Sequence, residues 1–163
     1  MSITRVLTVR SAALALTATF AAASLAAQTS HILVPADKVQ WAPAPPALPA
    51  GAEIAVLEGN PAEKGAVTLR LRFPANYNIP PHWHSMTERV TVLSGALNVG
   101  MGDTLDRSGS QRLDPGGFVS LPAKMHHFAW TASPTVVQIS LEGPFDIFYV
   151  KSTDNPQPPA KRE

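Results

Sequence analysis

Two histidines and a glutamate lie close together in the middle of the chain, in the run from His82 through His84 to Glu88. The sequence of 163 residues contains five histidines, and four of them are His82, His84, His126 and His127. Neutral imidazole nitrogens and carboxylate oxygens are the usual ligands of first-row transition metals. The chain contains no cysteine. The residue types therefore predict a metal site built from histidine and glutamate alone.

The spacing of these residues favours a β-strand as the element that positions them. Side chains two positions apart on a strand point to the same face, so His82 and His84 can reach one ion together. Glu88 has the same parity and can join them if the chain stays extended or makes a compensating turn. Val90 and Val92 continue that face, which would line a cavity with apolar surface.

A fourth ligand has to come from a distant part of the sequence, and His126 and His127 are the candidates. Three ligands from one strand and a fourth from a neighbour would leave open positions on the ion, whereas structural zinc sites close with four ligands and usually use cysteine. We therefore expect one divalent transition metal ion, which can be Fe, Mn, Ni, Cu, Co or Zn. Glu88 could also act as a catalytic base if its carboxylate leaves the ion.

Apolar and polar residues alternate along much of the chain after residue 53, which is the period of a β-strand. Turn residues separate the alternating segments, and the chain contains 16 prolines and 10 glycines. We expect an all-β fold of about eight or more antiparallel strands, arranged as a sandwich or a closed barrel. The strands are predicted at residues 54–56, 67–73, 89–93, 96–101, 118–121, 127–131, 136–141 and 147–150.

The N-terminal residues have the pattern of a secretory signal peptide. Arg5 and Arg10 give a positive start, a small and apolar stretch covers residues 11–23, and Ser24-Leu25-Ala26 supplies a cleavage signal. An uncleaved membrane anchor is the alternative, but the stretch is short and rich in alanine for a membrane span. We therefore expect residues 1–26 to be removed and the protein to be periplasmic or secreted, without a stable membrane anchor.

The charge and composition of the remaining chain limit its partners and indicate its segments. Loss of the two leader arginines leaves 11 basic against 12 acidic residues, so nucleic-acid binding has no electrostatic support. We expect an extended, Pro-rich segment at residues 27–52, a folded domain at 53–151 and a flexible tail at 152–163. The expected partner is a small-molecule ligand or substrate. A homodimer in which residues 31–41 exchange a strand is an alternative to a monomer.

The histidine run resembles the first sequence motif of the cupin superfamily. That motif consists of a glycine, five residues, HxH, three or four residues, a glutamate, six residues and a glycine. His82, His84, Glu88 and Gly95 match it, and Asn76 stands at the position of the first glycine. Asparagine also tolerates the left-handed backbone conformation, so this difference is compatible with the turn.

A second cupin motif follows in the expected order. Gly116, Pro122 and His127 match it, whereas Lys124 replaces a glycine and Thr131 replaces an asparagine. The two differences put the local geometry in doubt rather than the ligands. The resemblance to small, exported, single-domain cupins extends roughly over residues 66–141.

The resemblance implies a jelly-roll barrel, also called a double-stranded β-helix, with a metal inside it. The implied metal ligands are His82, His84, Glu88 and His127. Because neighbouring residues on a strand face opposite sides, His126 would point away from the metal.

The resemblance does not imply one reaction, because the cupin superfamily includes dioxygenases, oxalate-degrading enzymes, isomerases, lyases, sensors and storage proteins. The complete ligand set favours a metal-dependent oxidoreductase of the dioxygenase type, acting on a small oxygen-rich or phenolic molecule. The alternative is a non-catalytic metal- or ligand-binding protein of the cell envelope, such as a sensor or stress protein. Gln138, Ser140 and Tyr77 are the candidate pocket residues that would contact a ligand.

Overall fold

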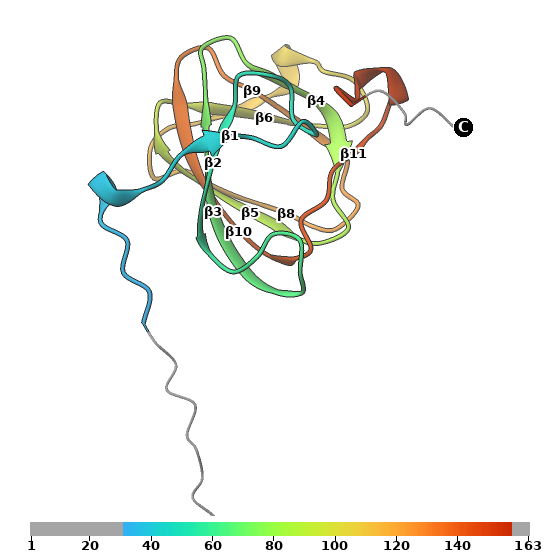
Figure 1. The fold of residues 1–163 in the computed structure, drawn as a ribbon. Coiled ribbons are helices and arrows are strands. Elements are labelled where there is room, and N and C mark those ends of the chain that lie inside the picture. Colours follow the sequence, from blue (N-terminus) through green and yellow to red (C-terminus); the bar gives the residue numbers. More distant parts are fainter. Residues whose placement is uncertain (1–30, 158–163) are drawn as a thin grey trace, which may run out of the picture. The chain divides into compact units, whose positions relative to one another are not determined.

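The computed structural model describes residues 31–157, which form two antiparallel β-sheets (Figure 1). One sheet has six strands in the order β1-β2-β3-β10-β5-β8, and the other has five in the order β11-β4-β9-β6-β7. The strands are β1 (Ala42–Pro43), β2 (Glu53–Glu58), β3 (Gly65–Phe73), β4 (Asn78–Trp83), β5 (Glu88–Ser94), β6 (Leu97–Met101), β7 (Gln111–Leu113), β8 (Phe118–Leu121), β9 (His127–Trp130), β10 (Thr135–Gly143) and β11 (Phe148–Tyr149). Three short 3-10 helices accompany them: η1 (Ala36–Lys38), η2 (Arg107–Gly109) and η3 (Ser152–Asp154). The predicted all-β jelly roll is confirmed.

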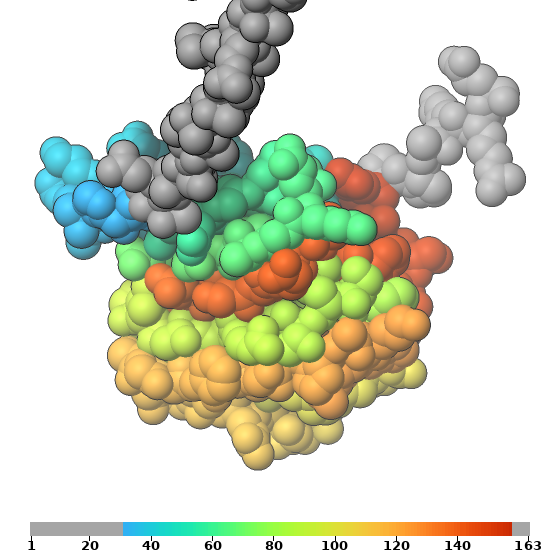
Figure 2. Space-filling view, turned by 90° about the horizontal axis from the view of Figure 1, so that it is seen from below, coloured from blue at the N-terminus to red at the C-terminus, as the bar shows by residue number. Residues whose placement is uncertain are grey.

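Strands β3 and β10 show how the alternating sequence produces the core. They pair antiparallel from Gly65 opposite Gly143 to Phe73 opposite Thr135. The apolar side chains at alternate positions from Val67 to Phe73 and from Val137 to Leu141 are buried between the sheets, and the residues between them are less buried. On the outer face Arg70 donates a hydrogen bond to Gln138, and Arg72 forms an ion pair with Glu53. Figure 2 shows the strands of this sheet as adjacent bands of colour.

The structure adds three strands outside the ranges predicted from alternation, β1, β4 and β7, of which β4 carries His82, where the histidine spacing favoured a strand. Strand β1 lies in the Pro-rich segment and at the edge of its sheet, with β2 as its neighbour on one side. Proline is tolerated in an edge strand because its missing N–H can face the side that has no neighbouring strand. Residues 31–41 contain the helix η1 and no strand. No helix within residues 31–157 is long and apolar enough to cross a membrane. The predicted signal peptide lies outside the described residues.

The two residues that replace motif glycines both adopt the left-handed backbone conformation that glycine favours. Asn76 has φ 59° and Lys124 has φ 64°. The backbone N–H of Lys124 donates to the carbonyl of His84 at 2.8 Å, so this turn supports the histidine run directly. Thr131, which replaces the motif asparagine, is buried, and its hydroxyl donates to the carbonyl of Pro74. These differences from the motif therefore preserve its turns.

Candidate metal centre

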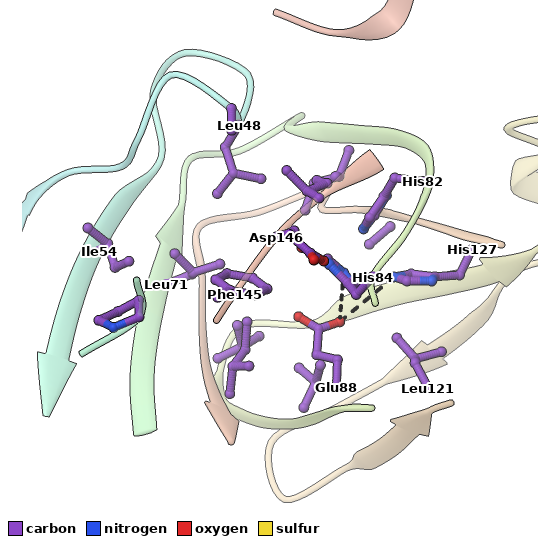
Figure 3. Close-up of a pocket in the computed structure, with 18 of the residues that line it drawn as sticks. Leu48, Ile54, Leu71, His82, His84, Glu88, Leu121, His127, Phe145 and Asp146 are labelled. Carbon is purple, nitrogen blue, oxygen red and sulfur yellow. Dashed lines mark hydrogen bonds and ion pairs between the residues drawn. The ribbon is translucent and has the colours of Figure 1, made fainter. Parts of the chain in front are cut away.

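A cavity of about 410 Å³ lies between the two sheets, and His82, His84 and His127 meet at one end of it (Figure 3). All three side chains are buried. Each offers a ring nitrogen, and these nitrogens lie within 4.8 Å of one another. That separation allows the three histidines to hold a single metal ion.

Two neighbouring strands bring these histidines together from distant parts of the chain. His82 lies on β4 directly opposite His127 on β9, and His84 follows just after the end of β4. Residues three positions apart on a regular strand face opposite sides. A register shift between Ile79 and His82 changes which side of β4 faces inward, so Ile79 and His82 both line the cavity. The sequence Pro80-Pro81 occupies this bulge, where the missing N–H groups break no regular ladder.

Backbone carbonyls hold each imidazole in one tautomer. The Nδ1–H groups donate to the carbonyls of Pro80 at 2.7 Å for His82, of Asp146 for His84 and of Met125 at 2.9 Å for His127. Since a carbonyl only accepts, the proton is on Nδ1 and the lone pair is on Nε2.

Two of these lone pairs are buried without a partner: Nε2 of His84 and Nε2 of His127 have no hydrogen bond. A buried acceptor without a partner is costly, and a metal ion at this point would satisfy both. Histidine ligands in metal sites commonly donate their other ring nitrogen to a carbonyl, as all three do here. The residues therefore fit a transition metal ion.

Glu88 supplies a carboxylate beside the histidines. It is the first residue of β5 and is buried. Its Oε2 lies 3.5 Å from Nε2 of His84 and 3.7 Å from Nε2 of His127. The chain bends between His84 and Glu88, so the compensating turn expected from the sequence is present. The expectation of three ligands on one strand is wrong, because His84 follows the end of β4 and Glu88 begins β5 in the other sheet. At these distances Glu88 could supply a fourth donor to an ion held by the three histidines.

The electrostatics of the site keep the donor groups in the form that binds a cation. Burial and the imidazoles of His127 and His84 lower the pKa of His82 to about 3. Burial also lowers the pKa of His127, although Glu88 partly opposes this. Burial would raise the pKa of Glu88, but His84 and the other two imidazoles hold it below its usual range. At neutral pH, His82 and His127 are therefore neutral and Glu88 is ionised.

The pKa of His84 shifts in the opposite direction. Burial acts to lower it, but the adjacent Glu88 carboxylate and the contacts with Asp146 raise it above the usual value for histidine. The imidazole of His84 is thus the one in the group that competes most strongly for a proton. Because a bound cation would take the place of that proton, the negative charge around His84 also favours a metal.

The segment after β10 completes the site, and sequence reasoning missed its role. The carboxylate of Asp146 accepts hydrogen bonds from the backbone N–H of Ser85 at 2.8 Å and from the Ser85 hydroxyl. The ring of Phe145 lies against His84, with ring centroids 5.3 Å apart. The available signal was the turn sequence Gly143-Pro144 after a strand, which indicates a change of direction but not what the next residues contact.

Three residues expected at the pocket do not line the cavity. Gln138 is on the outer face of β10, where it accepts from Arg70, and Ser140 shares that parity. The inward residues of β10 that line the cavity are Val137 and Ile139. Alternation along a strand predicts two faces without saying which one is inside, and here the apolar one is.

Tyr77 and His126 also lie outside the lining of the cavity. Tyr77 is buried, but its hydroxyl donates to the carbonyl of Pro49 instead of facing the cavity, which corrects the third pocket expectation. His126 points away from the histidine group, as alternation predicts, and its Nδ1 lies 2.6 Å from a carboxylate oxygen of Asp103.

Among solved structures, the fold is similar to a proposed acetylacetone dioxygenase from Methylibium petroleiphilum PM1. The identity is 20%, with 82% of this chain and 90% of that chain covered at a TM-score of 0.61. It is also similar to the polyketide cyclase RemF from Streptomyces resistomycificus, at 17% identity, with 64% and 75% of the two chains covered and a TM-score of 0.55. A third similar structure is the DMSP lyase DddQ from Ruegeria pomeroyi DSS-3, at 20% identity, 69% and 61% coverage and a TM-score of 0.55. At these identities the likeness shows the fold alone.

The sequence itself is 34% identical over 80 residues to germin-like protein subfamily 1 member 1 of Arabidopsis thaliana. That stretch is 48% of this chain but 37% of the plant protein, so the chain matches well under half of its relative. The model of the ChrR cupin-like domain family matches residues 29–145, which is most of the chain. The chain therefore belongs to the ChrR cupin-like family, within the cupin superfamily.

Proposed function

We propose that the protein is a metal-dependent oxidoreductase of the dioxygenase type that acts on a small oxygen-rich or phenolic molecule. The observation that carries the proposal is the group of buried, unpartnered Nε2 atoms and one buried carboxylate at the end of a cavity. His82, His84, His127 and Glu88 would hold one divalent transition metal ion. Such an ion supplies Lewis-acid and redox chemistry and has room for a substrate and O₂.

The other residues around the cavity support a reaction that depends on the ion. Among the described residues that line it, none carries a hydroxyl, a thiol or an amine. The second carboxylate, that of Asp146, is already engaged by Ser85. These described lining residues offer no nucleophile with a base, and Glu88 is the group placed to accept a proton from a bound molecule if its carboxylate leaves the ion. The apolar walls would exclude water from the reacting atoms.

Metal analysis and oxygen uptake test this proposal. The protein is produced without a histidine tag, stripped of metal and reloaded separately with Fe, Mn, Co, Ni, Cu and Zn. We expect about one ion per chain, and oxygen consumption with the iron or manganese form in a screen of catechols, flavonols and diketones. If an ion binds but no substrate is converted with any metal, the protein is instead a metal-binding envelope protein without this activity.

We also propose that the protein acts in the periplasm or outside the cell. The pattern of residues 1–26 supports export, since it has the positive start, the apolar stretch and the cleavage signal of a leader. N-terminal sequencing of protein from the native envelope should find a start near residue 27. An intact Met1 on protein in the cytoplasmic fraction would contradict export.

A further inference from the structure

The cavity at the histidines has a strongly unequal distribution of polar and apolar groups. Its polar side chains are the three histidines, Glu88 and Asp146. The other described lining residues are all apolar, among them Leu48, Ile54 and Leu71. In Figure 3 Leu48, Ile54 and Leu71 lie across the cavity from His82 and His127. A ligand that reaches the histidines therefore places the rest of its body against apolar walls.

The charges around the cavity disfavour an anionic ligand. No lysine or arginine is among the described lining residues, while Glu88 and Asp146 both contribute a carboxylate. A divalent ion together with Glu88 would leave about one positive charge, which is enough for one acidic oxygen of a ligand but not for a second carboxylate farther along the cavity. A carboxylate against Leu48 or Ile54 would lose its hydration without gaining a partner.

The size of the cavity points in the same direction. A volume of about 410 Å³ lies within the range of small-molecule sites and is much more than a two-carbon acid would fill. The Pro-rich segment that carries Leu48 is held in place by hydrogen bonds from two tyrosine hydroxyl groups. Tyr149 donates to the carbonyl of Ala47 at 2.8 Å, and Tyr77 donates to the carbonyl of Pro49.

We infer that the ligand of this site is a neutral molecule with an apolar body and oxygen donors at one end, and that Leu48 and Ile54 select for the body. The oxygen end faces the histidines and Glu88, and the body lies along the apolar wall. Small dicarboxylates such as oxalate are excluded as preferred ligands. This inference rests on the proposed metal site for the oxygen end, whereas the apolar wall is independent of it.

Hydroxamic acids, which chelate metals through two oxygens, test the inference with a constant head. Dissociation constants are measured from the visible spectrum of the cobalt-loaded protein for the two-, four-, six- and eight-carbon compounds. We expect the affinity to rise about fourfold for each added methylene until the cavity is filled. The eight-carbon compound with a terminal carboxylate should bind at least about tenfold more weakly than its methyl counterpart, and oxalate should bind more weakly still.

Matched variants locate the effect. Leu48→Ala and Ile54→Ala should each lower the affinity for the eight-carbon hydroxamic acid by roughly tenfold and leave the affinity for the two-carbon compound unchanged. Leu93→Ala, which alters an exposed leucine outside the cavity, is the control and should change neither. An affinity that is independent of chain length, or tighter binding of oxalate, would overturn the inference while the cobalt site and the proposed function stand.

A second arm needs no metal. The metal-free protein is titrated with 2-naphthol, a neutral fluorescent molecule, and saturable binding is expected that Leu48→Asp weakens and Leu93→Asp does not. If cobalt fails to bind, the proposed metal site fails, and this arm still decides whether the cavity takes apolar molecules. Absence of saturable naphthol binding, or equal binding by the Leu48→Asp variant, would overturn the inference.

Discussion

The two ends of the cavity are held in place by different kinds of contact. At the histidine end, every ring is fixed by a backbone carbonyl, and the rings themselves come from β4, β9 and the bend that follows β4. At the opposite end, the Pro-rich segment is fixed largely by the hydroxyl groups of Tyr77 and Tyr149 and by the short pairing of β1 with β2. The geometry of the metal ligands therefore depends on the sheets themselves. The wall that meets the ligand body depends on a few side chains.

The largest effect should follow from removal of one ligand at the histidine end. His84→Ala deletes a buried nitrogen of the proposed metal site, and we expect the metal affinity to fall by more than about 100-fold, since even the loss of a partner of a ligand costs ten- to 100-fold. Inductively coupled plasma mass spectrometry after dialysis should find no stoichiometric metal. His126→Ala, which alters the histidine just before β9 that contacts Asp103, is the control and should keep about one ion per chain. Full retention by His84→Ala would mean that the site is elsewhere.

Metal binding should also stabilise the fold, because the unfolded chain does not hold the three histidines together. A metal concentration of 100 times the dissociation constant should raise the free energy of unfolding by about 2.7 kcal/mol. Urea unfolding of the metal-free protein, with and without added metal, measures this difference. The His84→Ala variant should show almost no increase at the same metal concentration. An equal increase in both proteins would indicate that the metal binds elsewhere.

A smaller effect should come from the segment that supports the histidine run from outside. Asp146→Ala removes the carboxylate that accepts from Ser85, the residue next to His84, but leaves the backbone carbonyl that holds His84. We expect about a tenfold loss of metal affinity, measured by competition with a chromophoric chelator. Ser85→Ala keeps the backbone donor and should lose less. An unchanged affinity in Asp146→Ala would show that His84 is held by the backbone contact alone.

The contrast between the two ends explains how much of the site could be predicted from the sequence. His82, His84 and Glu88 are close in sequence, so a short turn is enough to bring them to one cavity, although Glu88 lies on β5 in the opposite sheet from β4. The choice of His127 over His126 came from the resemblance to the second cupin motif, and alternation then placed His126 on the other face. The sequence does not show the bulge at Pro80-Pro81, which explains why both Ile79 and His82 point into the cavity.

The parts that the sequence did not predict depend on contacts between distant segments. Gln138 and Ser140 are as regularly spaced as their apolar neighbours, so periodicity alone left both faces of β10 possible, and the burial of Val137 and Ile139 decides between them. The roles of Tyr77 and Asp146 follow from partners 28 and 61 residues away, Pro49 and Ser85. No local pattern carries that information.

At the opposite end of the cavity, Tyr77→Phe should cost about 1 kcal/mol of stability, because it removes one hydrogen bond to a carbonyl while keeping the ring that stacks on Phe73. Denaturant unfolding of the metal-free protein measures the loss. Since Tyr77 does not line the cavity, the metal affinity should stay within about twofold of that of the unchanged protein. A loss of metal binding in this variant would mean that the two ends are coupled through the sheet.

An effect that is absent at neutral pH is a loss of stability at alkaline pH, through the two tyrosines that hold the Pro-rich segment. Burial raises the pKa of Tyr149 to about 12, and burial together with Tyr149 raises the pKa of Tyr77 as well. Because both values lie above the ordinary tyrosine pKa of about 10, the unfolded chain releases these protons first. The stabilisation is therefore complete below about pH 10 and decreases as the pH rises through about 12. Urea unfolding of the metal-free protein at several pH values between 8 and 12 should show this decrease, and it should be smaller in Tyr77→Phe, which has one hydroxyl fewer to ionise. An equal decrease in both proteins would assign the alkaline sensitivity to groups other than Tyr77.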